Sequence, residues 1–260
     1  QSPSTSLLVP ATMRALIDHP AWPGAELRSL RFINSGSSVV PVALIEAFHA
    51  RGVPVAQVYG ATETGPVSIA LRPEQALHAV GSVGEAAPGV QIRLVDGEGR
   101  DVPAGDVGEI WVRGANLMRG YHRREDPGAF SDGWFRTGDL AHCDAQGRYT
   151  VVGRSKELII SGGENIYPAE IENLVAAVPG IAECAVVGMP DARWQEVPWL
   201  VLVAQPGALR DEAAVRQSYE QRLARFKHPR QIVWLDKGLP KTALGKVQRA
   251  ALVAALQSLS

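Results

Sequence analysis

The sequence predicts an α/β portion joined to a smaller α+β domain, because the pattern of apolar residues changes twice along the 260-residue chain. Predicted strands and helices alternate over residues 1–80, short strands separated by turns occupy 81–153, and a mixed pattern follows. We therefore expect residues 1–153 to be part of a large domain, made of a parallel α/β unit and a small antiparallel barrel. A connector at 154–156 leads to a compact α+β domain over 157–260.

The first portion has the order strand, helix, strand. Apolar residues at helical spacing predict a helix over Ala11–Asp18, and a predicted strand over Leu30–Ile33 leads into a serine-rich turn. A helix over Pro41–Ala50 and a second strand over Val53–Tyr59 follow. This order predicts a parallel pair of strands whose loops lie at the strand ends.

The later portions are identified by their turns. Asp-Gly and Pro-Ala-Gly turns separate alternating runs at Val90–Val95, Gly108–Arg113 and Gly147–Val152, which predict a small antiparallel sheet or barrel. In the C-terminal domain we expect helices over residues 168–178, 211–223 and 246–256, and strands over 181–188, 199–204 and 233–235.

Composition argues against several kinds of partner. Lys and Arg total 26 against 27 for Asp and Glu, so the charge balance does not favour a nucleic acid or an anionic membrane. No apolar run reaches about 18 residues, so we expect no membrane span. Cys143 and Cys184 lack metal-ligand spacing, and two such cysteines predict reduced thiols in a cytoplasmic protein.

Four short motifs carry most of the chemistry. Tyr59–Gly65 is a strand-to-loop turn with an aromatic face, two hydroxyls and a carboxylate. It is followed by Arg136–Asp139, by Gly153-Arg154 and by the late run Pro240–Lys246. Each motif alone is also explained by an ordinary polar turn. Together, in this order and over nearly the whole chain, they resemble the adenylate-forming superfamily, and within it the acyl-CoA synthetases.

The resemblance implies an ATP-dependent, AMP-forming acid–thiol ligase. In such an enzyme a small carboxylic acid attacks ATP to give an acyl-adenylate and pyrophosphate, and the thiol of coenzyme A then displaces AMP. The implied cofactors are ATP or AMP, Mg²⁺ and coenzyme A. Ser35-Gly-Ser-Ser38 stands where acyl-CoA synthetases commonly have Gly-Gly-Ala-Pro, which places Ser37 beside the adenine and the acyl pocket.

The same resemblance assigns the remaining residues that contact the base and the phosphates. Tyr59 would stack on adenine and Gln57 would contact the adenine amino group, with Gly60 beside them. Thr62 would hydrogen-bond the α-phosphate. Glu63 would bind magnesium, because a carboxylate is the hard oxygen ligand that this ion takes in proteins.

Asp139 matches the ribose-binding aspartate of the family, since an ionised carboxylate can accept from both ribose hydroxyls. Arg154 supports the same ribose by the match. The alternative for Asp139 is capping of a turn, and the alternative for Arg154 is a surface ion pair with Glu157 or Asp139.

Lys246 matches the catalytic lysine of the family, whose ammonium neutralises charge that builds during adenylation. Lys156 lies where relatives place the hinge about which the small domain rotates between the two steps. Gly162 and Gly163 would line the pantetheine passage, form a tight turn, or do both.

The sequence departs from the family in one respect. It has no Ser/Thr/Gly-rich loop ending in Pro-Lys-Gly, which in relatives holds the β- and γ-phosphates. We therefore expect a fragment whose partner is a missing N-terminal portion of the same protein, and which does not adenylate acids alone. Two alternatives stay open: an adenylation domain that loads a carrier protein, and a non-catalytic nucleotide- or partner-binding module. Self-association into a homo-oligomer is compatible with each.

Overall fold

The structure, a computed structural model, describes residues 2–123, 126–242 and 245–258. It divides into two compact units, Gln1–Ser155 and Lys156–Ser260. The elements of the first unit are β1 (Thr5–Leu8), α1 (Pro10–Ile17), η1 (Trp22–Gly24), β2 (Phe32–Ser35), α2 (Val42–His49), β3 (Val55–Tyr59), η2 (Thr62–Thr64), β4 (Ile69–Ala70), β5 (Glu85–Ala86), β6 (Val90–Val95), β7 (Gly108–Gly114), β8 (Phe130–Ser131), β9 (Trp134–Cys143) and β10 (Tyr149–Arg154).

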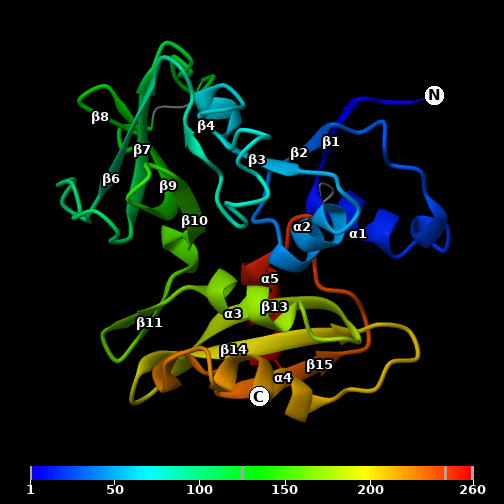
Figure 1. Cartoon of the computed structure of the whole chain (residues 1–260). Helices are drawn as coiled ribbons and strands as arrows, with labels where there is room; N and C mark the ends of the chain where they lie inside the picture. Colours follow the sequence, from blue (N-terminus) through cyan, green and yellow to red (C-terminus); the bar gives the residue numbers. More distant parts are fainter. Residues whose placement is uncertain (1, 124–125, 243–244, 259–260) are drawn as a thin grey trace. The chain divides into compact units, whose positions relative to one another are not determined.

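A mostly parallel sheet opens the first unit, with the strand order β1-β2-β3-β4-β5. Strands β1, β2 and β3 are parallel, whereas the short β4 and β5 are antiparallel. Figure 1 shows α1 and α2 beside these strands, and Met13 of α1, Ile33 of β2 and Phe48 of α2 share one buried cluster. The predicted parallel pair is confirmed as β2 and β3, and β1 is a further strand that the sequence did not indicate.

The second sheet of this unit is antiparallel, with the order β10-β9-β7-β6 and with β8 paired to β9. Ile110, Val112 and Ala141 form part of its buried side. The expected antiparallel strands are therefore confirmed. The sequence did not predict β9, because Trp134–Cys143 contains a glycine and two charged residues and does not alternate cleanly between apolar and polar positions.

The second unit contains one sheet with the order β12-β11-β14-β13, and β15 pairs in parallel with β14. Its elements are η3 (Ser155–Glu157), β11 (Ile159–Ser161), β12 (Glu164–Ile166), α3 (Pro168–Val175), β13 (Ile181–Asp191), β14 (Gln195–Ala204), α4 (Glu212–Glu220), η4 (Arg225–Lys227), β15 (Gln231–Leu235) and α5 (Arg249–Gln257).

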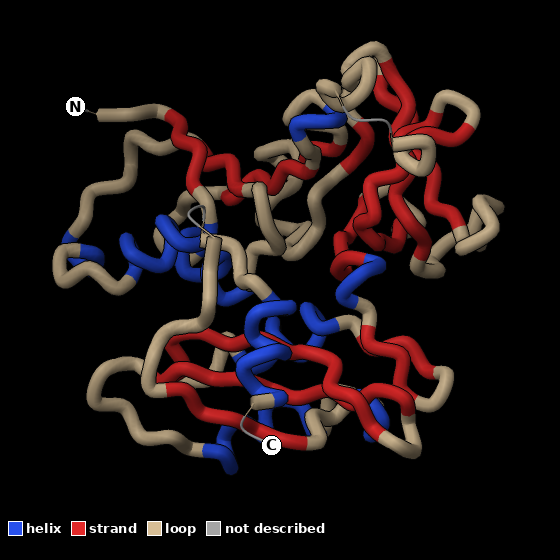
Figure 2. Tube along the Cα trace, turned by 180° about the vertical axis from the view of Figure 1, so that it is seen from behind, coloured by secondary structure: helices blue, strands red, loops and turns tan. Residues whose placement is uncertain are grey.

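Helices cover both faces of this sheet, because neighbouring residues of a strand point to opposite sides. Val186 and Leu200 share a buried cluster with residues of α3 and α4. Ala185 and Val201, each one position away, pack instead with residues of α5. Figure 2 shows helical segments lying across the strands of this unit. The expected α+β domain is confirmed.

The start of the last helix differs from the prediction. The sequence predicts a start near Lys246, but α5 begins at Arg249. The backbone turns at Gly245, whose φ is 79°, and Lys241 forms a short β-bridge with Val247. Lys246 therefore lies in a turn before the helix.

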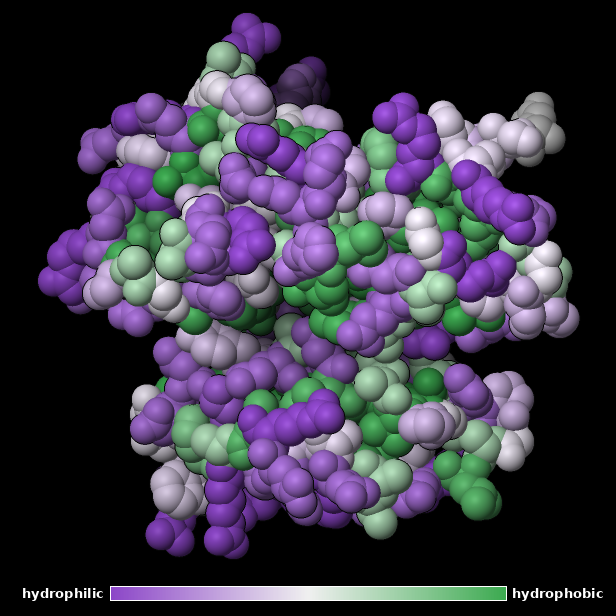
Figure 3. Space-filling model, viewed as in Figure 1, coloured by the Kyte–Doolittle hydropathy of each residue, from purple (hydrophilic) through white to green (hydrophobic). Residues whose placement is uncertain are grey.

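Polar residues occur in each described α-helix and on the surface of both units. No helix among the described residues is long and apolar enough to cross a membrane. On the face that Figure 3 shows, polar and apolar residues are intermixed over each unit, and neither kind forms one continuous area.

Candidate active site

Two glycines shape the turn that follows β3. A Cβ on Gly60 would lie 2.5 Å from the carbonyl oxygen of Pro66. A Cβ on Gly65, whose φ is 59°, would lie 2.8 Å from the carbonyl oxygen of Asn116. A side chain does not fit at either distance, so only glycine allows the chain to return so closely on itself. The turn between these glycines thus has a closely constrained backbone.

A bulge in β9 sets the direction of Asp139. Trp111 of β7 pairs with Arg136, whereas Glu109 pairs with Leu140, so a step of two residues on β7 faces a step of four on β9. The additional residues displace the end of β9 from a regular ladder. Bulges of this kind occur often beside active sites, where they change the direction of a side chain.

Side chains bind the backbone of the bulge in place of the ladder. The N–H of Gly138, whose φ is 70°, donates to Glu109 Oε1 at 3.0 Å. The N–H of Asp139 donates to Thr137 Oγ1 at 3.1 Å, and the Thr137 hydroxyl donates to the Ile110 carbonyl at 2.7 Å. Because these polar groups have partners, the irregular backbone does not leave buried donors unsatisfied.

Three of the predicted site residues meet at Asp139. The Tyr59 hydroxyl donates to Asp139 Oδ2 at 2.8 Å, and Arg154 Nε lies 2.9 Å from Asp139 Oδ1. Arg154 stands opposite Asp139 in the register of β9 and β10, which puts both side chains on one face of the sheet. Asp139 is only 9% exposed. A phenol therefore holds one oxygen of this carboxylate and a cation holds the other.

The surroundings keep Tyr59 a hydrogen-bond donor. Burial, and then the negative charge of Asp139, raise the pKa of Tyr59 far above its ordinary value. The phenol stays protonated at neutral pH and its O–H remains available to the carboxylate. The carboxylate is thus a fixed acceptor, and the two oxygens of a carboxylate are suited to accept from neighbouring hydroxyls of a diol.

Thr62 and Glu63 lie within the turn after β3, Thr62 exposed and Glu63 half-buried. The Tyr121 hydroxyl donates to Glu63 Oε1 at 3.2 Å. Residues 2–123, 126–242 and 245–258 hold no group of three or more His, Cys, Asp and Glu that could bind a metal ion. A single carboxylate nevertheless suits Mg²⁺, which keeps several waters and is usually bound together with substrate phosphates.

Gln57 and Ser37 are placed differently from each other. Gln57 is 4% exposed, and its side-chain amide donates to the Ser82 carbonyl at 2.8 Å. Ser37 is exposed with a φ of 75°, after Gly36, where a Cβ would lie 2.5 Å from the Val58 carbonyl oxygen. The adenine contact of Gln57 stays a prediction, and it would use an amide that already has a partner.

Lys246 and Lys156 belong to the second unit. The Lys246 N–H donates to Thr242 Oγ1 at 3.2 Å, and the Thr242 N–H donates to the Lys246 carbonyl at 2.8 Å. Residues 243 and 244 of this motif lie outside the described part of the chain. Lys246 itself is exposed, and Lys156 lies in η3 at the start of the unit. The catalytic and hinge roles of these lysines stay predictions.

Gly162 and Gly163 are the two central residues of the hairpin turn between β11 and β12. Ser161 pairs with Glu164, and the two glycines have φ values of 60° and 88°. Two positive φ values are the requirement of a tight two-residue hairpin turn. A Cβ on Gly162 would lie 2.5 Å from the ring of Trp194, whereas one on Gly163 would meet nothing within 4 Å. The pantetheine passage stays a prediction.

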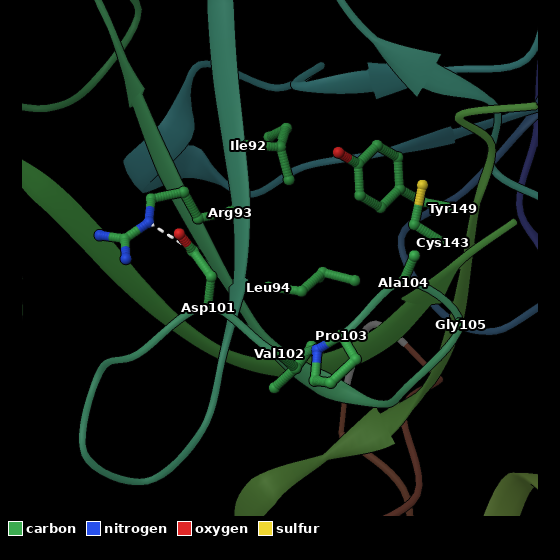
Figure 4. Close-up of a pocket in the computed structure, with 10 residues that line it drawn as sticks. All are labelled: Ile92, Arg93, Leu94, Asp101, Val102, Pro103, Ala104, Gly105, Cys143 and Tyr149. Atoms are coloured by element: carbon green, nitrogen blue, oxygen red, sulfur yellow. Dashed lines mark hydrogen bonds and ion pairs between the residues drawn. The ribbon is translucent and has the colours of Figure 1, made fainter. Parts of the chain in front are cut away.

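A separate hollow of about 310 Å³ lies in the antiparallel part of the first unit. Figure 4 shows Arg93 paired with Asp101 on one side and Cys143 beside Tyr149 on the other. Burial raises the pKa of Tyr149 to about 12 and also raises the pKa of the Cys143 thiol. Both groups are therefore neutral near pH 7, and none of the predicted site residues lines this hollow.

Sequence reasoning missed the residues that hold the site in place. Glu109 and Thr137 bind the bulge of β9, but their role depends on strand register, for which the sequence carries no direct signal. Glu183 and Arg249 bind the two arms of the Lys246 turn. Arg249 could have been noticed, because it stands three residues after Lys246 at the start of an apolar helical pattern.

Two family descriptions match the chain. Residues 1–122 match the family described as AMP-binding enzyme, and residues 170–246 match the AMP-binding enzyme C-terminal domain.

Curated proteins of similar sequence include CoA ligases. The chain is 50% identical over 246 residues to an indoleacetate–CoA ligase of Aromatoleum aromaticum, covering 94% of this chain and 48% of that protein. It is 41% identical over 241 residues to a feruloyl-CoA synthase of an Amycolatopsis species, covering 92% of this chain and 49% of that protein. The chain thus spans about half the length of the curated relatives that it matches.

Solved structures show the same fold. The anthranilate CoA ligase AuaEII in complex with anthranoyl-AMP has a TM-score of 0.90 and 32% identity, over 99% of this chain and 51% of that one. The o-succinylbenzoate CoA synthetase MenE from Bacillus subtilis, in complex with its acyl-adenylate intermediate, has a TM-score of 0.86 and 34% identity, over 96% of this chain and 51% of that one.

Proposed function

Because this chain belongs to the AMP-binding enzyme family, we propose that it forms the ribose-binding and lysine-bearing part of an ATP-dependent, AMP-forming acid–thiol ligase. The observation that carries the proposal is the Asp139 carboxylate, which Tyr59 and Arg154 fix from two sides as an oriented acceptor, the kind of group that binds the hydroxyls of a diol. The relatives named above are CoA ligases, and their names give the carrier-loading alternative no support.

In the first step a substrate carboxylate oxygen bonds to the α-phosphorus of ATP, and the bond from that phosphorus to pyrophosphate breaks. Asp139 orients the ribose, and Tyr59 with Ser37 and Gly60 offers a surface for adenine. The exposed Thr62 hydroxyl hydrogen-bonds the α-phosphate. Orientation of this kind brings the reacting atoms together before the reaction and lowers the entropic barrier.

Glu63 would hold Mg²⁺ together with phosphate oxygens, and the ion when bound supplies charge neutralisation on the phosphates. We assign a second positive charge to Lys246, whose exposed ammonium is a compact point charge on a flexible stem and would neutralise charge that builds on the phosphates. A charge placed where negative charge develops stabilises the transition state more than the bound substrate.

In the second step the sulfur of coenzyme A attacks the acyl carbon, and the bond to AMP breaks. We place the hinge for this change at Lys156, and we place the pantetheine chain along the Gly162-Gly163 turn. The open space beside Gly163 supports that placement. A Cβ there would meet nothing within 4 Å, and glycine itself leaves the backbone uncovered.

We further propose that the substrate is a carboxylic acid that bears a ring. The support is that the relatives include an indoleacetate–CoA ligase, a feruloyl-CoA synthase and a 2-succinylbenzoate–CoA ligase, each named for an acid with a ring. Incubating an active ligase that contains these residues with indoleacetate and with a straight-chain acid of similar size tests the proposal. Faster CoA ester formation with the straight-chain acid would contradict it.

We also propose that these 260 residues do not complete adenylation alone. The chain is about half as long as its named relatives, and it lacks the Ser/Thr/Gly-rich phosphate loop that the family resemblance implies. Exchange of labelled pyrophosphate into ATP that depends on added acid, catalysed by this chain alone, would refute this part of the proposal.

The nucleotide site is tested by titrating AMP into the chain in a calorimeter. We expect Asp139→Asn to weaken AMP binding by about tenfold or more, because a charge-assisted hydrogen bond contributes about 1.5–3 kcal/mol. Asp101→Asn is the matched control, since Asp101 is an exposed aspartate that pairs with an arginine in the same unit. Equal affinity of wild type and Asp139→Asn, or no AMP binding by wild type, would overturn the assignment.

A further inference from the structure

The turn that carries Lys246 is attached to the second unit by a charged residue on each arm. On the entering arm, Lys241 Nζ lies 2.9 Å from Glu183 Oε1, and the Leu239 N–H donates to Glu183 Oε2 at 3.1 Å. Both oxygens of one carboxylate on β13 thus bind the segment that leads into the turn. The short β-bridge between Lys241 and Val247 joins this arm to the leaving arm.

On the leaving arm, Arg249 binds three separate parts of the unit. Its Nε donates to Glu157 Oε2 at 2.9 Å. One terminal nitrogen donates to Glu172 Oε1 at 2.8 Å and to the Val186 carbonyl at 3.2 Å, and the other donates to Glu172 Oε2 at 3.2 Å. The planar fork of arginine makes this set of contacts, which the single ammonium of lysine cannot reproduce.

The Arg249 cluster is largely enclosed. The side chains of Arg249 and Glu172 are 21% and 18% exposed, and Glu172 Oε1 also accepts from the Val186 N–H at 2.7 Å. Burial alone would lower the pKa of Arg249, but Glu172 and Glu157 together raise it above the ordinary value. The guanidinium is therefore charged at any physiological pH, and loss of its contacts would leave two partly buried carboxylates without it.

We propose that Arg249 and Glu183 are positioning residues for Lys246, and that they hold the turn so that the ammonium is presented at a fixed place relative to the start of the unit. Glu157 directly follows Lys156, so one guanidinium connects the predicted hinge to the lysine turn. The functional part of this inference rests on the proposed ligase reaction. The structural part does not rest on that reaction. It states only that the turn depends on two clamps, by which we mean the charged contacts of Glu183 and of Arg249.

The physical reason is that Lys246 is exposed, so the position of its ammonium depends on the backbone that carries it. The turn has its own hydrogen bonds at Thr242 and Gly245, but these bonds do not tie it to the sheet. A displacement of about 1 Å in a catalytic group can cost about a hundredfold in rate. Leu239 and Val247 also pack against the apolar cluster of the sheet, and the contacts of Glu183 and Arg249 add charged attachments on both sides of the turn.

Hydrogen exchange on this chain tests the structural part. We expect Arg249→Lys and Glu183→Gln each to speed exchange of the Gly245, Lys246 and Gln248 amides by about tenfold, because each removes contacts between charged groups. Exchange in the buried strands β13 and β14 should stay within about twofold. Arg216→Lys is the matched control, since Arg216 forms an exposed pair with Glu212 in the same unit.

Activity of a ligase that contains these residues tests the functional part. We expect Arg249→Lys to slow acyl-adenylate formation by about a hundredfold at saturating ATP. Its use of a supplied acyl-adenylate with coenzyme A should match that of Arg216→Lys. A merely structural role would slow both steps together.

Two outcomes would overturn the inference. In the first, the turn amides of Arg249→Lys and Glu183→Gln exchange as in Arg216→Lys. In the second, exchange rises equally throughout the unit, which would show general destabilisation. A wild-type protein that forms no acyl-adenylate would instead count against the proposed ligase function, and the exchange result would still decide whether the clamps hold the turn.

Discussion

The two units hold the charges of the proposed site in opposite ways. In the first, Asp139 is 9% exposed, and side chains bind both of its oxygens directly. In the second, Lys246 is exposed, and the described contacts reach only its backbone and its neighbours in the turn. A buried charge is fixed through its own partners, whereas an exposed charge is fixed through the backbone that carries it. In the first unit, mutations of the residues that touch Asp139 should change its position directly. In the second unit, mutations of residues that hold the backbone should change the position of Lys246 without touching its side chain.

The largest effect is expected from the exposed charge itself. In an active ligase containing these residues, Lys246→Ala should raise the barrier to adenylation by about 3 kcal/mol or more, because a preorganised charge is lost from the transition state. Transfer of a supplied acyl-adenylate to coenzyme A should be unchanged. Rapid quench of both half-reactions measures this, with Lys237→Ala as a control lysine. Equal loss in both steps would contradict separate roles for the two units.

The next effect tests the turn that follows β3, between Gly60 and Gly65. Gly65→Ala should reduce the free energy of unfolding of the first unit by about 2–3 kcal/mol, since a positive φ combines with a clash against a backbone carbonyl. Gly105→Ala is the control, because Gly105 also has a positive φ but a Cβ there would meet nothing within 4 Å. Urea denaturation gives both values. If the two variants lose the same stability, the close approach to Asn116 is without consequence.

A smaller effect is expected from one partner of the buried carboxylate. Tyr59→Phe keeps the ring but removes the hydroxyl that donates to Asp139 Oδ2. We expect a loss of about 1–2 kcal/mol in the free energy of unfolding, because a buried acceptor loses a charge-assisted bond. AMP affinity should fall by less than in Asp139→Asn. Stability unchanged by Tyr59→Phe would mean that Arg154 alone fixes the carboxylate.

A last effect appears only at alkaline pH. The pKa of Tyr149 is raised by burial to about 12 in the folded chain, against about 10 in an unfolded one. Folding therefore favours the protonated phenol, and this contribution is present below about pH 10 and is lost as the pH rises towards about 12. The first unit should lose stability in this window, and Tyr149→Phe should reduce that loss. Thermal unfolding followed against pH measures the difference, and an unchanged slope would contradict it.

The same contrast explains what could be predicted from the sequence. Strand, helix and strand over β2, α2 and β3 follow from local periodicity, and so do α3, β13 and α4. Tyr59, Asp139 and Arg154 were identified by the motifs that carry them. Their mutual contacts were not, because they depend on the register of β9 against β10, which is set by residues far apart in the sequence.

At the Lys246 turn, local periodicity predicts the right type of element but the wrong starting residue. Apolar periodicity continues smoothly from Val247 into α5, so it predicts a helix that starts too early. The actual start at Arg249 follows from the β-bridge between Lys241 and Val247 and from the hydrogen bond of the Gln248 N–H to the Pro240 carbonyl, which local periodicity does not contain. Local sequence pattern predicts whether a segment is a helix or a strand more reliably than it predicts the residue at which the segment begins or ends.

The bulge in β9 also has a consequence for length variation. Between the paired positions, β9 has two residues more than β7. Because this number is even, the side chains of Arg136 and Leu140 point to the same face of the strand. Removing one residue between them would leave an excess of one, which an ordinary β-bulge accommodates. Removing two would keep the alternation but abolish the displacement of Asp139.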